Sequence, residues 1–350
     1  MVLPIDIQQN TSLSLSEIAD EITVVELELT DESRINPDRV RRVLLYDDQI
    51  IVASKDNILV FNIKGKFIRC IGSIGQGLGA YVEGSIGNVV LDEKNKRLFV
   101  YTVPKIICYD LDGNFLYESI MPRMSMCYKA NMSYVSDMNY VNDELLLIVE
   151  NLWIMDENGL FNHSGLYRLN SDLQITDSCT IRKTYYDRPV MTYHTYEDYI
   201  IFRDSTIYIY YPDSFVGDPA ETLLRDTLYR LENNQLIPIA KLKFKNDGID
   251  NLKDRYINIC NIYRSARYVF AVYRTWLVNS DYHYFCYDTK TGKGYHMKDG
   301  YTDDINRLEA PVGFRPFNTN PERFYYWHTR QVPVGIDTPN PTLFIGKLKQ

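Results

Sequence analysis

The chain has 350 residues, of which 45% are hydrophobic and 13% are aromatic, including 29 tyrosines. Aromatic side chains suit half-buried pleated sheets, so this composition favours a folded, β-rich chain and argues against disorder. The formal net charge is −8 and no stripe of Lys and Arg offsets it, which argues against a nucleic-acid partner. Because no apolar run approaches the ~18 residues that cross a bilayer, we expect no transmembrane span.

Residues 1–20 form a lead-in that is followed by the first expected strand. The segment Glu21–Leu29 alternates apolar and acidic residues with the period of two that is typical of a strand. It belongs to no complete structural unit of its own. We therefore expect it to pair with a strand elsewhere in the chain.

The first complete unit begins at Val40. Four short apolar segments are separated by polar turns, in which Gly and Asn supply the positive φ that tight hairpins need. This pattern predicts a four-stranded antiparallel meander. From the innermost to the outermost strand, its segments are Val40–Leu45, Ile50–Ala53, Ile58–Asn62 and Phe67–Ile71.

The same unit recurs along the chain. In each copy an aromatic residue ends one apolar strand, a polar turn follows, and a second apolar strand begins. The spacing lies in, or slightly above, the range of propeller repeats. Five copies of this phrase begin at Phe61, Tyr109, Tyr167, Tyr229 and Tyr287, and a degenerate strand centred on Phe344 closes the chain.

A nearly continuous apolar segment precedes each phrase, as expected for a strand that is buried on both faces. In the fourth unit we place this central strand at Tyr199–Phe202, and Tyr211–Thr227 is interpreted as an insertion with one or two helical turns. In the other units the central segments are Ile50–Ala53, Arg97–Tyr101, Glu144–Val149, Tyr268–Tyr273 and Phe324–Trp327.

Six such units predict an all-β fold: a six-bladed β-propeller of four-stranded antiparallel blades, with residues 21–350 as one domain. The ring is expected to close when the N-terminal strand, Glu21–Leu29, pairs with the last blade at Thr342–Lys347. That pairing removes exposed sheet edges.

The stretch after the first blade resembles the signature of a family of bacterial six-bladed propellers related to NHL-repeat proteins. The usual phrase of that family is Gly-Lys-Phe-Ile-Arg, then Ile-Gly-x-x-Gly-Gln-Gly-Pro-Gly-Glu-Tyr. Here Gly65–Arg69 and Ile71–Tyr81 match it, except that Leu78 replaces Pro and Ala80 replaces Glu. The resemblance implies a protein that follows a secretion signal, often of the lipoprotein type, at the periplasm or the cell surface. It implies no established activity and no catalytic residue.

Short motifs in the chain point to structure more than to chemistry. The glycines of Gly72–Gly79 suit a crossover between blades better than a phosphate loop, because Lys and Ser or Thr do not follow them. Asp110–Asn114 matches a hairpin turn better than a calcium loop. The six cysteines show no C-x-x-C pair, and we expect buried thiols while leaving a Cys70–Cys108 disulfide open. We assign no catalytic residue, metal or cofactor.

One mouth of the central channel is the candidate ligand-binding site. Residues at the starts of innermost strands are expected to face it, and tyrosine rings there can stack on sugars or peptides. His194 lies in the expected innermost strand of the fourth blade, Met191–Thr195. The candidate residues are Arg41, Tyr81, Tyr134, Tyr193, His194, Tyr256 and Arg315.

The leading functional hypothesis is a non-enzymatic propeller of the bacterial cell envelope that binds a peptide, a glycan or a protein partner. The alternative is a metal-dependent hydrolase or lyase whose site lies in the central channel. The two hypotheses differ in whether His and carboxylate side chains from several blades converge on one point. The sequence leaves the ligand and the oligomeric state open.

Overall fold

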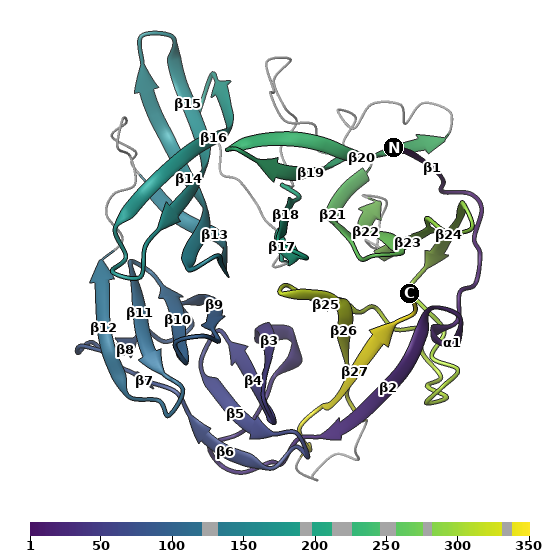
Figure 1. The fold of residues 1–350 in the computed structure, drawn as a ribbon, viewed down its shortest axis with the longest axis horizontal. Coiled ribbons are helices and arrows are strands. Elements are labelled where there is room, and N and C mark those ends of the chain that lie inside the picture. Colours follow the sequence, from purple (N-terminus) through teal and green to yellow (C-terminus); the bar gives the residue numbers. More distant parts are fainter. Residues whose placement is uncertain (121–131, 190–197, 212–225, 246–256, 276–281, 331–337) are drawn as a thin grey trace.

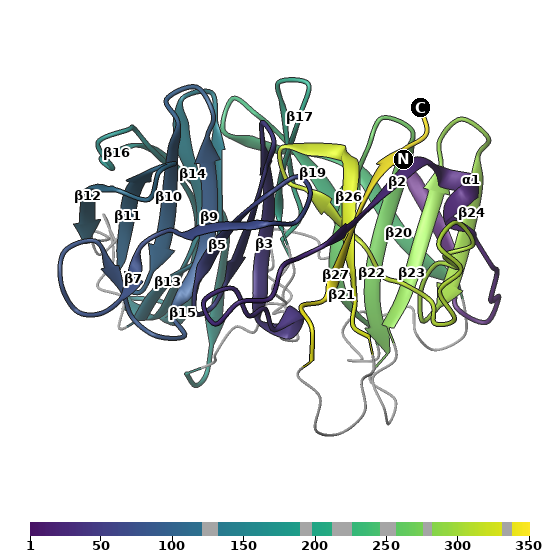
Figure 2. The ribbon, with the colours of Figure 1, turned by 90° about the horizontal axis from the view of Figure 1, so that it is seen from below.

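The computed structural model describes residues 1–120, 132–189, 198–211, 226–245, 257–275, 282–330 and 338–350. In these residues, six sheets of four or five strands stand around a central axis (Figure 1). Figure 2 shows the blades edge-on, with their strands running between the two faces of a disc. The predicted six-bladed, all-β propeller is confirmed.

In each of the first three blades, the four strands are arranged in sequence order from the innermost to the outermost. All their strand pairs are antiparallel. A short parallel pair, β7 (Ser73–Ile74) and β8 (Ala80–Tyr81), lies in the crossover between blades 1 and 2. The strands of blade 1 are β3 (Val40–Tyr46), β4 (Gln49–Ser54), β5 (Ile58–Asn62) and β6 (Phe67–Cys70); those of blade 2 are β9 (Ile86–Asp92), β10 (Arg97–Thr102), β11 (Lys105–Asp110) and β12 (Phe115–Ile120); those of blade 3 are β13 (Met132–Val141), β14 (Glu144–Asp156), β15 (Gly159–Leu169) and β16 (Ile175–Tyr186).

The last three blades have the same order from the axis outwards. The strands of blade 4 are β17 (Ile200–Arg203), β18 (Thr206–Ile209), β19 (Thr227–Glu232) and β20 (Gln235–Lys245); those of blade 5 are β21 (Ile257–Arg264), β22 (Tyr268–Thr275), β23 (Tyr282–Asp288) and β24 (Lys293–Lys298); those of blade 6 are β25 (Arg315–Phe317), β26 (Asn320–His328), β27 (Thr342–Leu348) and β2 (Ala19–Glu26).

The ring closes as the sequence predicts. Strand β2 pairs antiparallel with β27, with Val24 opposite Phe344, and forms the outermost strand of blade 6. In Figure 1 the purple β2 and the yellow β27 lie side by side. Because the two ends of the chain share one sheet, opening the ring requires breaking that sheet.

The N-terminal strap, residues 1–18, crosses the outside of two blades before it reaches blade 6. Its strand β1 (Val2–Asp6) pairs in parallel with β20 and adds a fifth strand to blade 4. The Thr11 backbone N–H donates to the His296 carbonyl of blade 5 at 2.7 Å, and a single helical turn, α1 (Leu15–Ile18), leads into β2. Five apolar side chains anchor the strap, each at most 2% exposed: Leu3, Ile5, Leu13, Leu15 and Ile18.

The predicted hairpin turns have the backbone conformation that their residue types suggest. Gly65, Gly113, Gly292 and the pair Asn233–Asn234 all have positive φ. Gly65 also has a packing reason to be glycine, because a Cβ there would lie 2.0 Å from the Glu26 carbonyl oxygen of β2. These turns fix the register of the blades.

The strand assignment in blade 4 was wrong. We placed Tyr199–Phe202 as the central strand, but β17, at Ile200–Arg203, is the innermost strand of its sheet. The reason is the two-residue turn Asp204–Ser205, in which both residues have positive φ and join β17 tightly to β18. This turn contains neither Gly nor Asn, so the usual hairpin signal is missing. The predicted insertion falls mostly on residues 212–225, outside the described residues.

The apolar core is divided among the spaces between neighbouring blades. One cluster combines Leu44 of blade 1 with Leu91 of blade 2, and another combines Val43 of blade 1 with Phe317 of blade 6. The five described cysteines are free thiols, and Cys70 and Cys108 form no disulfide. In the described part of the chain, no helix has the length and apolarity needed to cross a membrane.

Candidate functional site

Three innermost strands are interrupted by one extra residue at a comparable place: Arg41 in β3, Ser136 in β13 and Cys260 in β21. Such bulges bend a strand and redirect the side chain that follows. The next residue in each strand is polar and buried, namely Arg42, Asp137 and Asn261. The bulges therefore bring polar side chains into the otherwise apolar centre of the ring.

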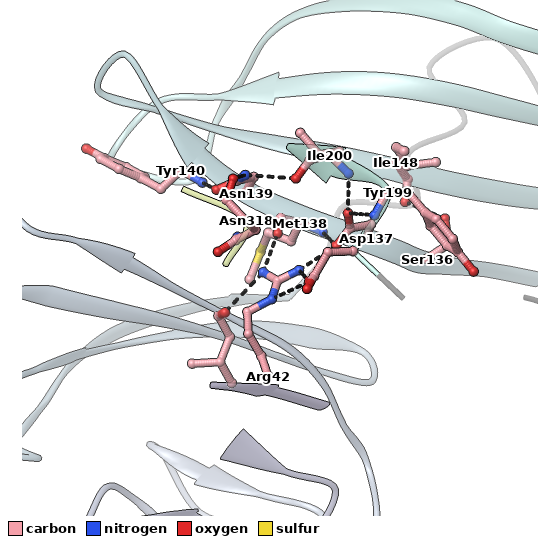
Figure 3. A network of polar contacts seen from close by, with 12 residues as sticks. Arg42, Ser136, Asp137, Met138, Asn139, Tyr140, Ile148, Tyr199, Ile200 and Asn318 are labelled. Atoms are coloured by element: carbon pink, nitrogen blue, oxygen red, sulfur yellow. Dashed lines mark hydrogen bonds and ion pairs between the residues drawn. The ribbon is translucent and has the colours of Figure 1, made fainter. Parts of the chain in front are cut away.

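The Arg42 side chain donates hydrogen bonds to residues of three other blades (Figure 3). Its Nε donates to Asp198 Oδ1 at 2.7 Å, and its Nη2 donates to the same oxygen and to Asp137 Oδ1, the latter at 2.8 Å. Its Nη1 donates to the carbonyls of Met138 and Val89 at 2.7 and 3.2 Å. All the donor nitrogens of Arg42 are therefore used. We call Arg42, Asp137 and Asp198 the axial clamp.

Asp137 extends the axial clamp to the backbone of blade 4. Its Oδ2 accepts hydrogen bonds from the N–H groups of Tyr199 and Ile200 at 2.8 and 2.7 Å, and its Oδ1 accepts one from Met138 N–H at 2.7 Å (Figure 3). Every neighbour that contacts this carboxylate in these bonds is a donor. The arrangement therefore favours the ionised form of the group.

Asparagine side chains connect the remaining blades to this centre. Asn139 Nδ2 donates to Ile200 O at 3.0 Å and contacts Asn318 O of blade 6 at 3.5 Å. Asn261 of blade 5 donates to Asp198 O at 3.1 Å. Polar contacts near the axis, among the described residues, thus involve all six blades.

The clamp holds two carboxylates and one guanidinium in a dry environment. Burial opposes the charge on Arg42, but attraction to Asp198 and Asp137 outweighs it and raises the pKa of Arg42. Burial, opposed by the Arg42 charge, raises the pKa of Asp137 to about 6, and the nearby Asp198 carboxylate acts in the same direction. Ionising Asp137 in this place is therefore costly, and the clamp depends on Arg42.

Two amides near the axis have unused hydrogen-bonding groups. Neither the Nδ2 nor the Oδ1 of Asn318 has a partner among the described residues, and the residue is 2% exposed. The Oδ1 of Asn261 likewise accepts no hydrogen bond from a described residue. Buried amides without partners reduce stability, so these two groups are weak points of an otherwise saturated network.

A pocket of about 200 Å³ lies beside the axis, at the mouth where the innermost strands end, which we call the end mouth. Its apolar part comes from the ends of β3, β9 and β25, and its polar part comes from blades 2 and 6. It is lined by Leu44, Leu45, Leu91, Glu93, Phe317, Thr319, Asn320 and Arg323. This end-mouth pocket is thus formed by described residues of blades 1, 2 and 6.

Three of the sequence-predicted candidates lie near the opposite mouth, where the innermost strands start, which we call the start mouth. Arg41, Tyr134 and Arg315 lie near the starts of β3, β13 and β25 and are half-buried. Tyr81 is only 2% exposed, and its hydroxyl contacts the Ile71 carbonyl in the core between blades 1 and 2. In this conformation Tyr81 has no free ring face for a ligand. The remaining three candidates, Tyr193, His194 and Tyr256, lie outside the described residues.

Sequence reasoning missed the axial clamp, although one signal was present. Val40–Leu45 is an apolar strand that contains two arginines, and Asp137 interrupts another innermost strand. A charge in a strand buried on both faces needs a partner of opposite charge. That signal could have paired Arg42 with Asp137, but it could not identify Asp198 or the end-mouth pocket, which depend on contacts between distant blades.

Solved structures with similar folds share little sequence with this chain. A crystal structure of a candidate exported protein of Bacteroides fragilis has 16% identity and a TM-score of 0.63, and the match covers 100% of both chains. The WD40 domain of Pan2 from Neurospora crassa has 11% identity and a TM-score of 0.45, over 89% of this chain and 76% of that one. The propeller domain of the Trilobed protease from Pyrococcus furiosus has 12% identity and a TM-score of 0.42, over 89% and 83%. The first match supports the fold, and the other two superpose too loosely to support an argument.

The search of curated proteins gave no match. A family model described as a domain of unknown function, DUF4934, matches residues 2–332. That match covers the strap and nearly all of the six blades. The chain therefore belongs to the DUF4934 family.

Proposed function

We propose that this chain is a non-enzymatic binding propeller of the bacterial cell envelope and that it binds its partner at the end-mouth pocket. The observation that carries the proposal is the contrast between an Arg42 centre whose donors are used by the fold and an open pocket at one mouth. Concave sites with an apolar floor and a few polar groups are the usual form of ligand sites. The partner is a peptide, a glycan or the surface loop of a protein.

The proposed location rests on two likenesses. The glycine-rich signature after the first blade resembles exported propellers, and the Bacteroides fragilis structure that shares the fold is named as a candidate exported protein. Both support a periplasmic or cell-surface protein. The free thiols of the five described cysteines are compatible with that location because three of them are buried in the blades.

The geometry favours binding over metal-dependent hydrolysis in the channel. The Arg42 guanidinium lies between the carboxylates of Asp137 and Asp198, where a metal ion would need them as ligands. Among the described residues, no three His, Cys, Asp or Glu side chains gather closely enough to ligate one ion. These observations support the non-enzymatic proposal.

The proposal is tested by NMR of leucine methyl groups, because three leucines line the pocket. Peptides and cell-wall glycan fragments are titrated into the wild type and into Leu45→Trp, which fills the pocket. A ligand of this site should shift the methyl signals of Leu44 and Leu91, and Leu45→Trp should abolish the effect. The control is Leu116→Trp, at an exposed position on β12 of blade 2.

Two results would count against the proposal. Methyl shifts that persist in Leu45→Trp would show that the ligand binds outside the end-mouth pocket. In a second measurement, protein purified without chelator is analysed for metal and its melting point is followed with Ca²⁺, Zn²⁺ and Mn²⁺. Stoichiometric metal that raises the melting point would favour the metal-dependent alternative.

A further inference from the structure

We propose that the end-mouth pocket recognises the zwitterion of an amino acid with an apolar side chain, with the carboxylate on Arg323 and the ammonium group on Glu93. This inference rests on the proposed function, because it names the chemistry of the same site. It follows from the size of the pocket, from its apolar floor and from the two opposite charges at its borders.

The floor of the pocket is apolar and belongs to the core. Leu44 and Leu91 are buried in the cluster between blades 1 and 2, and Phe317 is buried in the cluster between blades 6 and 1. An aliphatic side chain that enters the pocket would therefore contact carbon atoms and lose its water shell. Thr319 and Asn320 add hydrogen-bonding groups at the exposed rim.

Arg323 is a cation whose side chain has no polar partner among the described residues. It lies on β26 and is half-buried, and only its backbone takes part in strand pairing. The adjacent acid already has partners, because Glu322 Oε1 forms an ion pair with Arg203 Nε at 3.0 Å and accepts a hydrogen bond from Ala266 N–H at 2.6 Å. The residue directly opposite Arg323 on β27 is Lys347, another cation. The guanidinium therefore suits an external carboxylate, which it can bind in bidentate fashion.

Glu93 supplies the opposite charge on the other side of the pocket. It directly follows β9 of blade 2, it is exposed, and no ion pair joins it to another described residue. The neighbouring Lys94 does not neutralise it, because Lys94 Nζ pairs with Asp143 at 2.7 Å. Blade 1 separates blade 2 from blade 6, so the two charges border the apolar floor from different sides.

The size of the pocket limits the ligand. A volume of about 200 Å³ is below the ~300–1,000 Å³ of sites for drug-sized ligands. A single amino acid is small enough to enter it whole, whereas a larger ligand such as an oligosaccharide would enter it only in part. The zwitterion satisfies both charges at once, which neither an amine nor a carboxylic acid alone can do.

The experiment compares three probes that share one side chain: L-leucine, N-acetyl-L-leucine without the ammonium group, and L-leucinamide without the carboxylate. Binding is measured at low ionic strength from the methyl signals of Leu44 and Leu91 in the whole chain. We expect L-leucine to bind most tightly. A hydrogen-bonded charge contributes on the order of tenfold or more in affinity. L-leucinamide has no carboxylate for Arg323, so it should bind more weakly than L-leucine by that factor.

Two variants test whether Arg323 binds the carboxylate of the ligand and Glu93 binds its ammonium group. Arg323→Gln should weaken L-leucine about tenfold or more and leave L-leucinamide unchanged. Glu93→Gln should weaken L-leucine roughly two- to fivefold, because the group is exposed, and should leave N-acetyl-L-leucine unchanged. The matched control is Arg330→Gln on the same blade, whose side chain pairs with Glu26 outside the pocket. It should bind L-leucine as the wild type does.

Equal binding of L-leucine and L-leucinamide, or an Arg323→Gln variant with wild-type affinity for L-leucine, would overturn the inference. Absence of any L-leucine binding would overturn it as well. The proposed function would survive these results if an uncharged peptide or glycan fragment shifted the same methyl signals, and it would fail with them if no compound did so.

Discussion

Two arginines near the centre of the ring have opposite surroundings. Arg42 is 2% exposed and donates five hydrogen bonds to blades 2, 3 and 4. Arg323 is half-buried at the end-mouth pocket and contacts no acid among the described residues. The comparison shows that a charge in a propeller does not by itself identify a ligand site. A guanidinium whose donors are satisfied by the fold holds the blades together, and one whose donors are free is available to a ligand.

The largest expected effect is the loss of the Arg42 charge. Arg42→Met would leave Asp137 and Asp198 buried without a counter-charge, and breaking a buried pair in this way costs about 3–5 kcal/mol. We expect that decrease in the free energy of unfolding, measured with urea. The matched control is Arg323→Met, which removes a charge that pairs with no described residue and should change stability by less than about 0.5 kcal/mol. Similar losses in the two variants would remove the distinction between the arginines.

The cost of Arg42→Met should decrease as the pH falls. In the wild type, burial raises the pKa of Asp137 to about 6 although Arg42 opposes it, so removing Arg42 raises that pKa further. A carboxyl group with a higher pKa in the folded chain than its unfolded value of about 3.9 binds more protons when folded. Its contribution to stability therefore increases as the pH falls through the folded pKa. Near pH 5, the difference between variant and wild type should be about 1–2 kcal/mol smaller than near pH 7.5. A difference that is constant with pH would contradict the account of the axial clamp.

These expectations concern a centre that the sequence predicted only in part. The aromatic phrase at Phe61 and Tyr109 predicted the blades, because strands and turns are determined by neighbouring residues. The alternation in Glu21–Leu29 predicted the ring closure with β27 for the same reason. The clamp differs, since Arg42 and Asp198 are distant in sequence and meet only after a bulge redirects one strand.

The candidate site shows the same limit. The start-mouth residues were chosen from the starts of predicted strands, which requires correct strand order in every blade. In blade 4 the order was wrong because Asp204–Ser205 forms a tight turn without Gly or Asn. The end-mouth pocket joins Glu93 of blade 2 to Arg323 of blade 6, and no periodic pattern relates those positions.

A smaller effect on stability is expected at His296, which the fold keeps neutral instead of charged. His296 Nδ1 donates to the Gln9 carbonyl of the strap at 2.9 Å, and Nε2 accepts from the Tyr273 hydroxyl at 2.5 Å. Burial lowers the pKa of His296 below its ordinary value near 6.5. As the pH falls, His296 therefore becomes protonated in the unfolded chain at a higher pH than in the folded chain. The contribution of neutral His296 to the free energy of unfolding is complete above about pH 6.5, and it is lost as the pH falls towards the folded pKa. Between about pH 7.5 and 5, the free energy of unfolding of the wild type should therefore fall more than that of His296→Asn. Parallel pH profiles in urea unfolding would show that the strap does not depend on neutral His296.

The smallest effect should come from an ion pair with nearly the same geometry as the clamp. Lys94 Nζ lies 2.7 Å from Asp143, and Arg42 Nη2 lies 2.8 Å from Asp137, but the Lys94 and Asp143 side chains are 71% and 58% exposed. Water and salt screen the exposed pair, and two long side chains lose freedom when they form it. The unfolding curve of Lys94→Ala should therefore coincide with that of the wild type at low and at high salt. If Lys94→Ala were as damaging as Arg42→Met, distance rather than burial would determine the strength of an ion pair here, and the contrast between the clamp and the pocket would lose its physical basis.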